Sequence, residues 1–187
     1  MLPLLILWLT ATLWGTTPIV NDTTSKEAFP LVSQDGQTAT IYYSENDFPV
    51  VPISAQMFAS DIERVTSHPA SVQSAQRLKQ LRHAPSVIVG TIGHSTLIDE
   101  LVAKGLINTS TIAGQWEASV TTTISHPRTG QPLLVIAGSD RRGTAFGITA
   151  LCRAIGVSPW YWWADVPPAV KEALYLTNGT YIQNEPF

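Results

Sequence analysis

Apolar and polar residues recur along the chain with a period that switches between that of strands and that of helices. The run TATIYY, at residues 38–43, is rich in β-branched and aromatic side chains and predicts a strand. A helix over residues 53–65 is predicted by apolar residues that share one helical face: Ile53, Met57, Phe58, Ile62 and Val65. It should end before Pro69, because proline disfavours helical backbone in the residue before it. A short second helix is expected within residues 72–81.

The next segment predicts one buried strand and one helix. SVIVG, at residues 86–90, is apolar apart from its ends and predicts a buried strand. A glycine-containing loop, TIGH at residues 91–94, follows it. Ser95 is placed to cap a helix, and Gly105 to end it. The apolar stripe of that helix would be Leu97, Ile98, Leu101 and Val102.

A β-hairpin and a long helix complete the pattern. Residues 115–124 alternate between the two faces of a strand, residues 126–130 form a Pro/Gly turn, and LLVIA at residues 133–137 is a continuous apolar run. A helix is predicted over residues 141–155. Its core-facing residues would be Phe146, Ile148, Leu151, Cys152 and Ile155. The element order β-α-β-α-β-β-α predicts an α/β fold, a single domain whose mixed β-sheet is flanked by helices.

We expect four segments: a signal peptide at residues 1–19, an irregular segment at 20–36, the α/β domain at 37–168, and a linker at 169–187. The first 14 residues form an apolar run without a charged side chain, which is shorter than the ~20 residues of a bilayer span. A cleaved signal is therefore favoured over a signal anchor, and no membrane contact is expected after cleavage.

Three sequons, at Asn21, Asn108 and Asn178, agree with export through a eukaryotic secretory route, so we expect a secreted, extracellular protein. Cys152 is the one cysteine, which rules out an intramolecular disulfide. Its place in an apolar helical stripe favours a buried structural role over a nucleophilic one.

Composition removes several classes of function. Charged residues make up 13% of the chain, the net charge is −3, and no basic cluster marks a nucleic-acid partner. The four histidines do not stand at the spacing of metal ligands, so no metal is expected. The run VGTIGHS lacks the phosphate-loop fingerprint of dinucleotide sites, which disfavours a nucleotide-binding domain, and we expect no cofactor.

The most unusual stretch is an aromatic cluster near the end of the predicted domain. Four consecutive residues carry aromatic rings: Trp160, Tyr161, Trp162 and Trp163. Asp165 follows them two positions later. On extended backbone they would face both ways, so one buried face could not cover them all. Composition favours packing against a neighbouring domain, and a platform for sugar stacking is the alternative.

A second candidate is the turn between the apolar strand and the long helix. Asp140 stands where it could cap that helix. Arg141 or Arg142 could hold a carboxylate, such as that of a uronic acid, by paired hydrogen bonds. A capped helix start with one arginine on a neighbouring domain is the simpler interpretation.

Taken in order, VIVGTIG, GQWEASV, VIAGSDRRGTAFGI and IGVSPWYWWADVP resemble the N-terminal region of glycoside hydrolase family 115. The resemblance implies an accessory domain packed against a (β/α)8 catalytic barrel. It also implies an enzyme that removes glucuronic acid, or its 4-O-methyl ether, from xylan, with a xylan-type polysaccharide as its partner.

No catalytic residue can be assigned within the 187 residues, because the family's acidic motif would follow Phe187. Glycoside hydrolysis needs two suitably spaced carboxyl groups. The sequence therefore predicts the front piece of a secreted α-glucuronidase that is inactive alone. A stand-alone, non-catalytic carbohydrate-binding or interaction module remains the alternative.

Overall fold

The computed structural model describes residues 20–21, 28–82, 85–158 and 160–184, without the side chain of Trp162. The expected signal peptide at residues 1–19 lies outside this part of the chain. Among the described residues, none of the helices has the length and apolar character to cross a bilayer.

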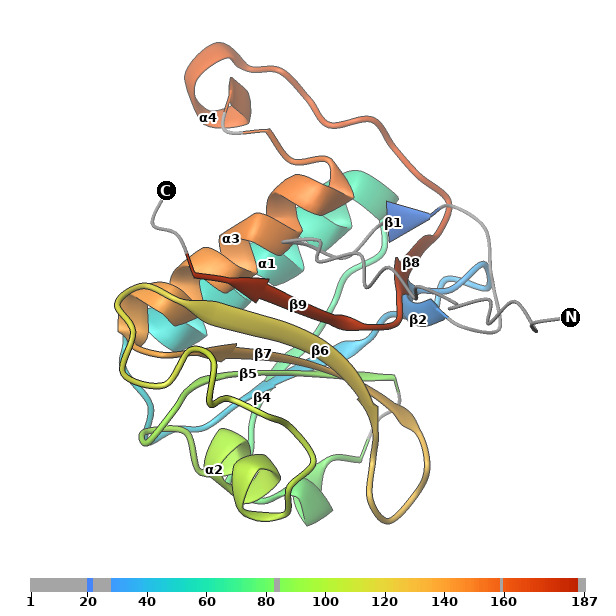
Figure 1. The fold of residues 1–187 in the computed structure, drawn as a ribbon. Helices are drawn as coiled ribbons and strands as arrows, with labels where there is room; N and C mark the ends of the chain where they lie inside the picture. Colours follow the sequence, from blue (N-terminus) through green and yellow to red (C-terminus); the bar gives the residue numbers. More distant parts are fainter. Residues whose placement is uncertain (1–19, 22–27, 83–84, 159, 185–187) are drawn as a thin grey trace, which may run out of the picture.

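The centre of the fold is a mixed six-stranded sheet with helices on both faces, as the sequence predicts (Figure 1). Four neighbouring strands pair in parallel, and the hairpin partner β6 (Ser119–Ser125) pairs antiparallel with both of its neighbours. In order across the sheet the strands are β4 (Val72–Ser74), β3 (Thr40–Tyr43), β5 (Ser86–Thr91), β7 (Pro132–Gly138), β6 (Ser119–Ser125) and β9 (Thr180–Gln183).

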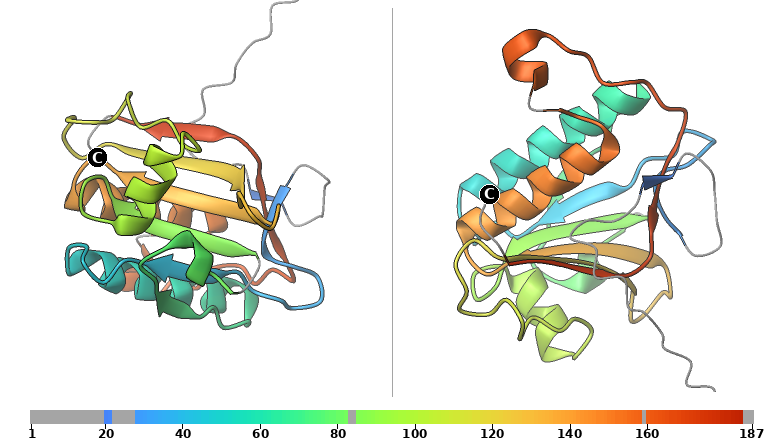
Figure 2. Two further views of the ribbon diagram at one scale, coloured as in Figure 1. Left: turned by 90° about the horizontal axis from the view of Figure 1, so that it is seen from below. Right: turned by 45° about the horizontal axis from the view of Figure 1, so that its top comes forward.

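Helices α1 (Val50–Thr66) and α3 (Arg141–Ile155) lie side by side on one face, and α2 (Thr96–Ala103) covers the other (Figures 1 and 2). Strands β5 and β7 are apolar on both faces, which explains their continuous apolar runs. Val89 and Ile136 pack toward α1 and α3, whereas Ile88 and Val135 pack toward α2.

The two predicted helix caps, Ser95 and Asp140, are confirmed. Ser95 accepts a hydrogen bond from the backbone N–H of Ile98 and begins α2. Asp140 caps α3, and Gly156 ends it in the left-handed conformation. Helix α1 starts three residues earlier than the apolar stripe suggested, immediately after Pro49.

The expected irregular segment at residues 20–36 was wrong for its described residues. It holds β1 (Val20–Asn21) and β2 (Ala28–Val32), which pair with the two edges of β8 (Leu174–Thr177) in a separate three-stranded sheet. The described part of the expected linker, residues 169–184, likewise contains regular structure, because β8 and β9 (Thr180–Gln183) belong to the two sheets. Both segments are fixed by pairing between distant parts of the chain.

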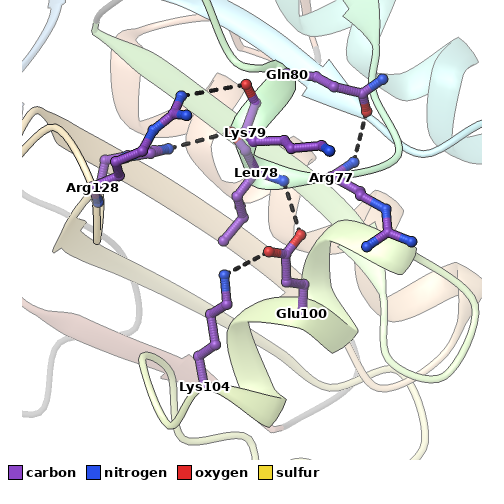
Figure 3. A network of polar contacts seen from close by, with 8 residues as sticks. Arg77, Leu78, Lys79, Gln80, Glu100, Lys104 and Arg128 are labelled. Atoms are coloured by element: carbon purple, nitrogen blue, oxygen red, sulfur yellow. Dashed lines mark hydrogen bonds and ion pairs between the residues drawn. The ribbon is translucent and has the colours of Figure 1, made fainter.

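The helix expected within residues 72–81 was also wrong: the segment forms β4 and the short 3₁₀ turn η1 (Leu78–Gln80). The backbone N–H groups of Arg77 and Leu78 donate to side chains instead of to a helical ladder (Figure 3). Glu100 accepts the N–H of Leu78 at 2.9 Å, and the Gln80 amide oxygen accepts that of Arg77 at 2.8 Å. Leu78 is thereby buried against α2.

Candidate functional site at the two ends of helix α3

The structure places the two predicted groups of site residues at opposite ends of α3. Asp140, Arg141 and Arg142 lie at its N-terminal end, and the aromatic cluster follows its C-terminal end. A helix of 15 residues spans about 22 Å. Within this chain the two groups therefore form two separate surfaces.

The carboxylate of Asp140 accepts hydrogen bonds from three backbone N–H groups. Its Oδ1 accepts hydrogen bonds from the N–H groups of Arg142 and Gly143 at 2.9 and 2.7 Å, and its Oδ2 accepts one from Glu117 at 3.0 Å. Partial burial raises the pKa of Asp140, but these three donors and the Arg142 guanidinium outweigh it and lower the pKa below its usual value. Asp140 is therefore an ionised structural cap, poorly suited to donating a proton.

The two arginines differ in their surroundings. Arg142 forms an ion pair with Glu117, with Nη2 3.0 Å from Oε1, and its guanidinium lies 5.7 Å from the ring centre of Phe146. Arg141 is exposed, and within the described chain its guanidinium makes no hydrogen bond or ion pair. Of the two candidates, Arg141 is therefore the one placed to hold a carboxylate from outside the domain, while Arg142 is paired within its own domain.

An apolar groove of about 390 Å³ lies beside these arginines, between the first turns of α1 and α3. Its lining comprises Phe48, Pro49, Val50, Arg141, Arg142, Ala145 and Phe146. Asp47 fixes the α1 side, because its carboxylate accepts hydrogen bonds from the N–H groups of Thr91, at 2.7 Å, and Phe48, at 2.8 Å. No local sequence pattern marks this groove, because it forms where two helix starts that are distant along the chain lie together.

The aromatic cluster forms the short helix α4 (Trp160–Ala164), so the expectation of extended backbone was wrong. Trp160 is 65% exposed and Trp163 84% exposed. Tyr161 is half-buried beneath the guanidinium of Arg64, and Asp165 is exposed just beyond the helix with φ of 50°. The domain's own core therefore leaves at least two of the four rings uncovered.

Cys152 is buried beside α1. Burial, followed by the nearby Asp61, raises the pKa of its thiol. Raising the pKa removes the reactive thiolate, so the structural interpretation of Cys152 fits its environment. Within the described residues no group of three or more His, Cys, Asp or Glu side chains could hold a metal ion.

The three sequon asparagines differ in exposure. Asn108 and Asn178 are exposed, the first in the loop after α2 and the second in the turn between β8 and β9. The Oδ1 of Asn108 accepts a hydrogen bond from the Ser110 hydroxyl at 2.8 Å. Asn21 is half-buried, and its amide donates to Thr177 at 3.3 Å.

No family model and no curated protein matches the chain. Among solved structures, it is similar to BtGH115A, a family GH115 4-O-methyl-α-glucuronidase with specificity for decorated arabinogalactans. The identity is 35%, the TM-score is 0.65, and the match covers 83% of this chain and 18% of that enzyme.

Two further solved structures are similar at a lower level. CpGH84D shares 10% identity over 87% of this chain and 22% of its own, with a TM-score of 0.47. CpGH84B shares 15% identity over 91% of this chain and 22% of its own, with a TM-score of 0.45. Both likenesses are too weak to bear on function.

The match to BtGH115A covers most of this chain, and the chain spans less than a fifth of that enzyme's length. The chain belongs to glycoside hydrolase family 115.

Proposed function

We propose that this chain is the N-terminal accessory domain of a secreted glycoside hydrolase that removes glucuronic acid, or its 4-O-methyl ether, from a plant polysaccharide. The observation that carries the proposal is the 35% identity over 83% of the chain with a 4-O-methyl-α-glucuronidase. We take xylan as the polysaccharide from the sequence resemblance. Decorated arabinogalactan, the substrate of the similar enzyme, is the competing substrate.

In this function the domain supports the catalytic barrel and contributes no catalytic carboxyl group. Asp140 is ionised and fully engaged as a cap, and Glu117 is paired with Arg142. An inverting or retaining glycosidase needs one carboxyl group that can be protonated and a second one across the sugar. We expect both groups in the catalytic barrel, and we expect Trp160 and Trp163 to pack against that barrel.

A second function is favoured by one observation, the exposure of Trp160 and Trp163. Exposed aromatic rings can stack on the C–H faces of sugars, so the chain could act as a carbohydrate-binding module without a catalytic partner. In that case the chain itself should bind polysaccharide.

Three measurements test these functions. The transcript downstream of Phe187 should encode a barrel with an acidic motif, and the purified 187-residue chain should release no glucuronic acid from glucuronoxylan or arabinogalactan. Retardation of the chain in polysaccharide-containing gels, lost in Trp160→Ala/Trp163→Ala but kept in Trp116→Ala, would support the binding module. Release of glucuronic acid by the isolated chain would overturn the supporting role.

A further inference from the structure

We infer that the groove between the first turns of α1 and α3 is the docking site of the polypeptide that completes the family 115 enzyme. The docking segment inserts an apolar side chain between Phe48 and Phe146 and places a carboxylate against Arg141. This inference rests on the proposed function and adds to it a surface and the chemistry of its occupant.

The groove has the size and character of a binding site. Its volume of about 390 Å³ lies within the range of ligand pockets, and its lining is apolar apart from the two arginines. Phe48 and Phe146 are half-buried, so each ring keeps an uncovered part. Apolar surface rimmed by charge is typical of protein–protein contacts.

The groove walls are held in place before any partner arrives. Asp47 fixes Phe48 through its backbone N–H, and the ring of Phe48 lies 4.1 Å from that of His94, centre to centre. On the other wall, Asp140 fixes the first turn of α3. A pre-organised surface loses little conformational entropy on binding.

Charge defines what the occupant carries. Glu117 neutralises Arg142, and the nearby carboxylates of Asp47 and Asp140 accept hydrogen bonds from backbone N–H groups. Arg141 therefore keeps an unpaired positive charge at the rim, as far as the described chain goes. A carboxylate on the partner would complete a charge-assisted, two-point contact.

The course of the chain brings the partner to this edge of the sheet. Gln183, the last residue of β9, pairs with Ser119, which pairs with Gly138 at the start of the turn into α3. At about 4.8 Å between strands, Gln183 leaves the sheet about 10 Å from Gly138. Under the proposed function the rest of the enzyme follows this exit, and the similar family 115 enzyme is more than five times as long as its match here.

A second feature at the same edge points to a missing contact. The Oε1 atom of Gln183 is buried and has no hydrogen-bond partner among the described residues. Its side chain shares a sheet face with that of Ser119, which lies against Gly147 of α3. Buried acceptors in native proteins are seldom left without a donor, so the partner is expected to supply one here.

The test compares the 187-residue chain with the longer protein encoded by its transcript. Ala145→Cys places a thiol in the groove, and Ala103→Cys places one on α2, at the opposite face of the sheet, as the matched control. Alkylation at each position is read by peptide mass spectrometry. Cys152, which is buried, should stay unlabelled and thereby report that each variant is folded.

We expect alkylation of Ala145→Cys to be about tenfold slower in the longer protein, because an interface core excludes water, whereas Ala103→Cys changes less than about twofold. Adding Arg141→Glu should restore most of the lost labelling, because like charges then oppose each other, and Arg141→Lys should not. Equal labelling in both proteins, or equal protection at both positions, would overturn the groove as the docking site. Protection that is insensitive to Arg141→Glu would overturn the carboxylate contact.

A transcript that ends at Phe187 would overturn the proposed function and this inference with it. A transcript that continues into a barrel, together with an unprotected groove, would overturn the inference alone.

Discussion

The guanidinium of Arg64, on α1, lies over the ring of Tyr161, on α4, with its Cζ atom 4.9 Å from the ring centre. The same guanidinium pairs with the carboxylate of Asp61, with Nη1 2.6 Å from Oδ1. Asp61 is buried, and its partner is therefore held in one orientation. The buried carboxylate of Asp61 thus positions Arg64, which contacts Tyr161 of the aromatic helix.

Removal of the two contacts separately should give different losses of stability. Tyr161→Leu removes the cation–π contact and should lower the free energy of unfolding by about 0.5–1 kcal/mol. Arg64→Ala also leaves Asp61 buried without its partner and should cost about 2–4 kcal/mol. Trp163→Ala, at an exposed position of α4, should change it by less than about 0.5 kcal/mol. Urea denaturation measures all three, and equal losses for Arg64→Ala and Tyr161→Leu would contradict the coupling to Asp61.

Replacement of the α3 cap should lower stability in a pH-dependent way. The pKa of Asp140 is lower in the folded chain than in the unfolded chain. Its contribution is therefore fully present above the unfolded pKa, near 4, and is lost as the pH falls through the folded pKa. Asp140→Asn should cost about 1 kcal/mol at pH 7, and the difference from the wild type should shrink as the pH falls below about 4.

Chemical denaturation at a series of pH values tests this directly. The exposed Asp165→Asn is the control and should change the free energy of unfolding by less than about 0.5 kcal/mol at pH 7. A cost of Asp140→Asn that stays constant down to pH 3 would show that the carboxylate is not held ionised by its donors.

Local patterns predicted much of this structure. The stripe that begins after Asp140, the alternation before the turn at residues 126–130 and the apolar run after it each depend on neighbours within a few residues. Helix α3 and the hairpin of β6 and β7 accordingly agree with the sequence. Strand β2 depends instead on pairing with β8, far along the chain, where Phe29 lies opposite Leu176. No local period marks such a strand.

The candidate site was predicted only in its parts. Asp140 and the two arginines were recognised, because caps and charged turns have local signals. The groove was missed, since Phe48 and Phe146 meet only when α1 and α3 pack side by side. The aromatic run forms a helix and not the expected extended segment, and its contact between Tyr161 and Arg64 depends on tertiary structure that no short window contains.

Gly143 should tolerate no side chain. A Cβ atom at this position would overlap the carbonyl oxygen of Ala118, where α3 crosses the start of β6. The clash should outweigh the gain of about 1 kcal/mol in helix propensity from Gly→Ala, with a net loss of about 1–3 kcal/mol. Thermal unfolding of Gly143→Ala measures the loss, and Thr149→Ala on the same helix, expected within about 0.5 kcal/mol of the wild type, is the control. An unchanged or raised stability would mean that α3 can move away from Ala118.

The surface around α4 should behave as an uncovered interface when the 187-residue chain is isolated. Trp160 and Trp163 are followed by Val166 and Val170, which are 49% and 72% exposed, so one short segment carries four exposed apolar side chains. Patches of this kind bind apolar dyes and promote self-association. Trp160→Ser/Trp163→Ser should therefore reduce dye fluorescence by about half or more and shift sedimentation toward the monomer.

Trp116, 74% exposed but remote from α4 in sequence, supplies the control Trp116→Ser, which should change neither measurement. If Trp116→Ser were to lower dye binding as much as the double variant, the effect would reflect exposed tryptophan in general. The aromatic helix would then no longer be supported as a second surface, in addition to the groove between α1 and α3, that meets the rest of the enzyme.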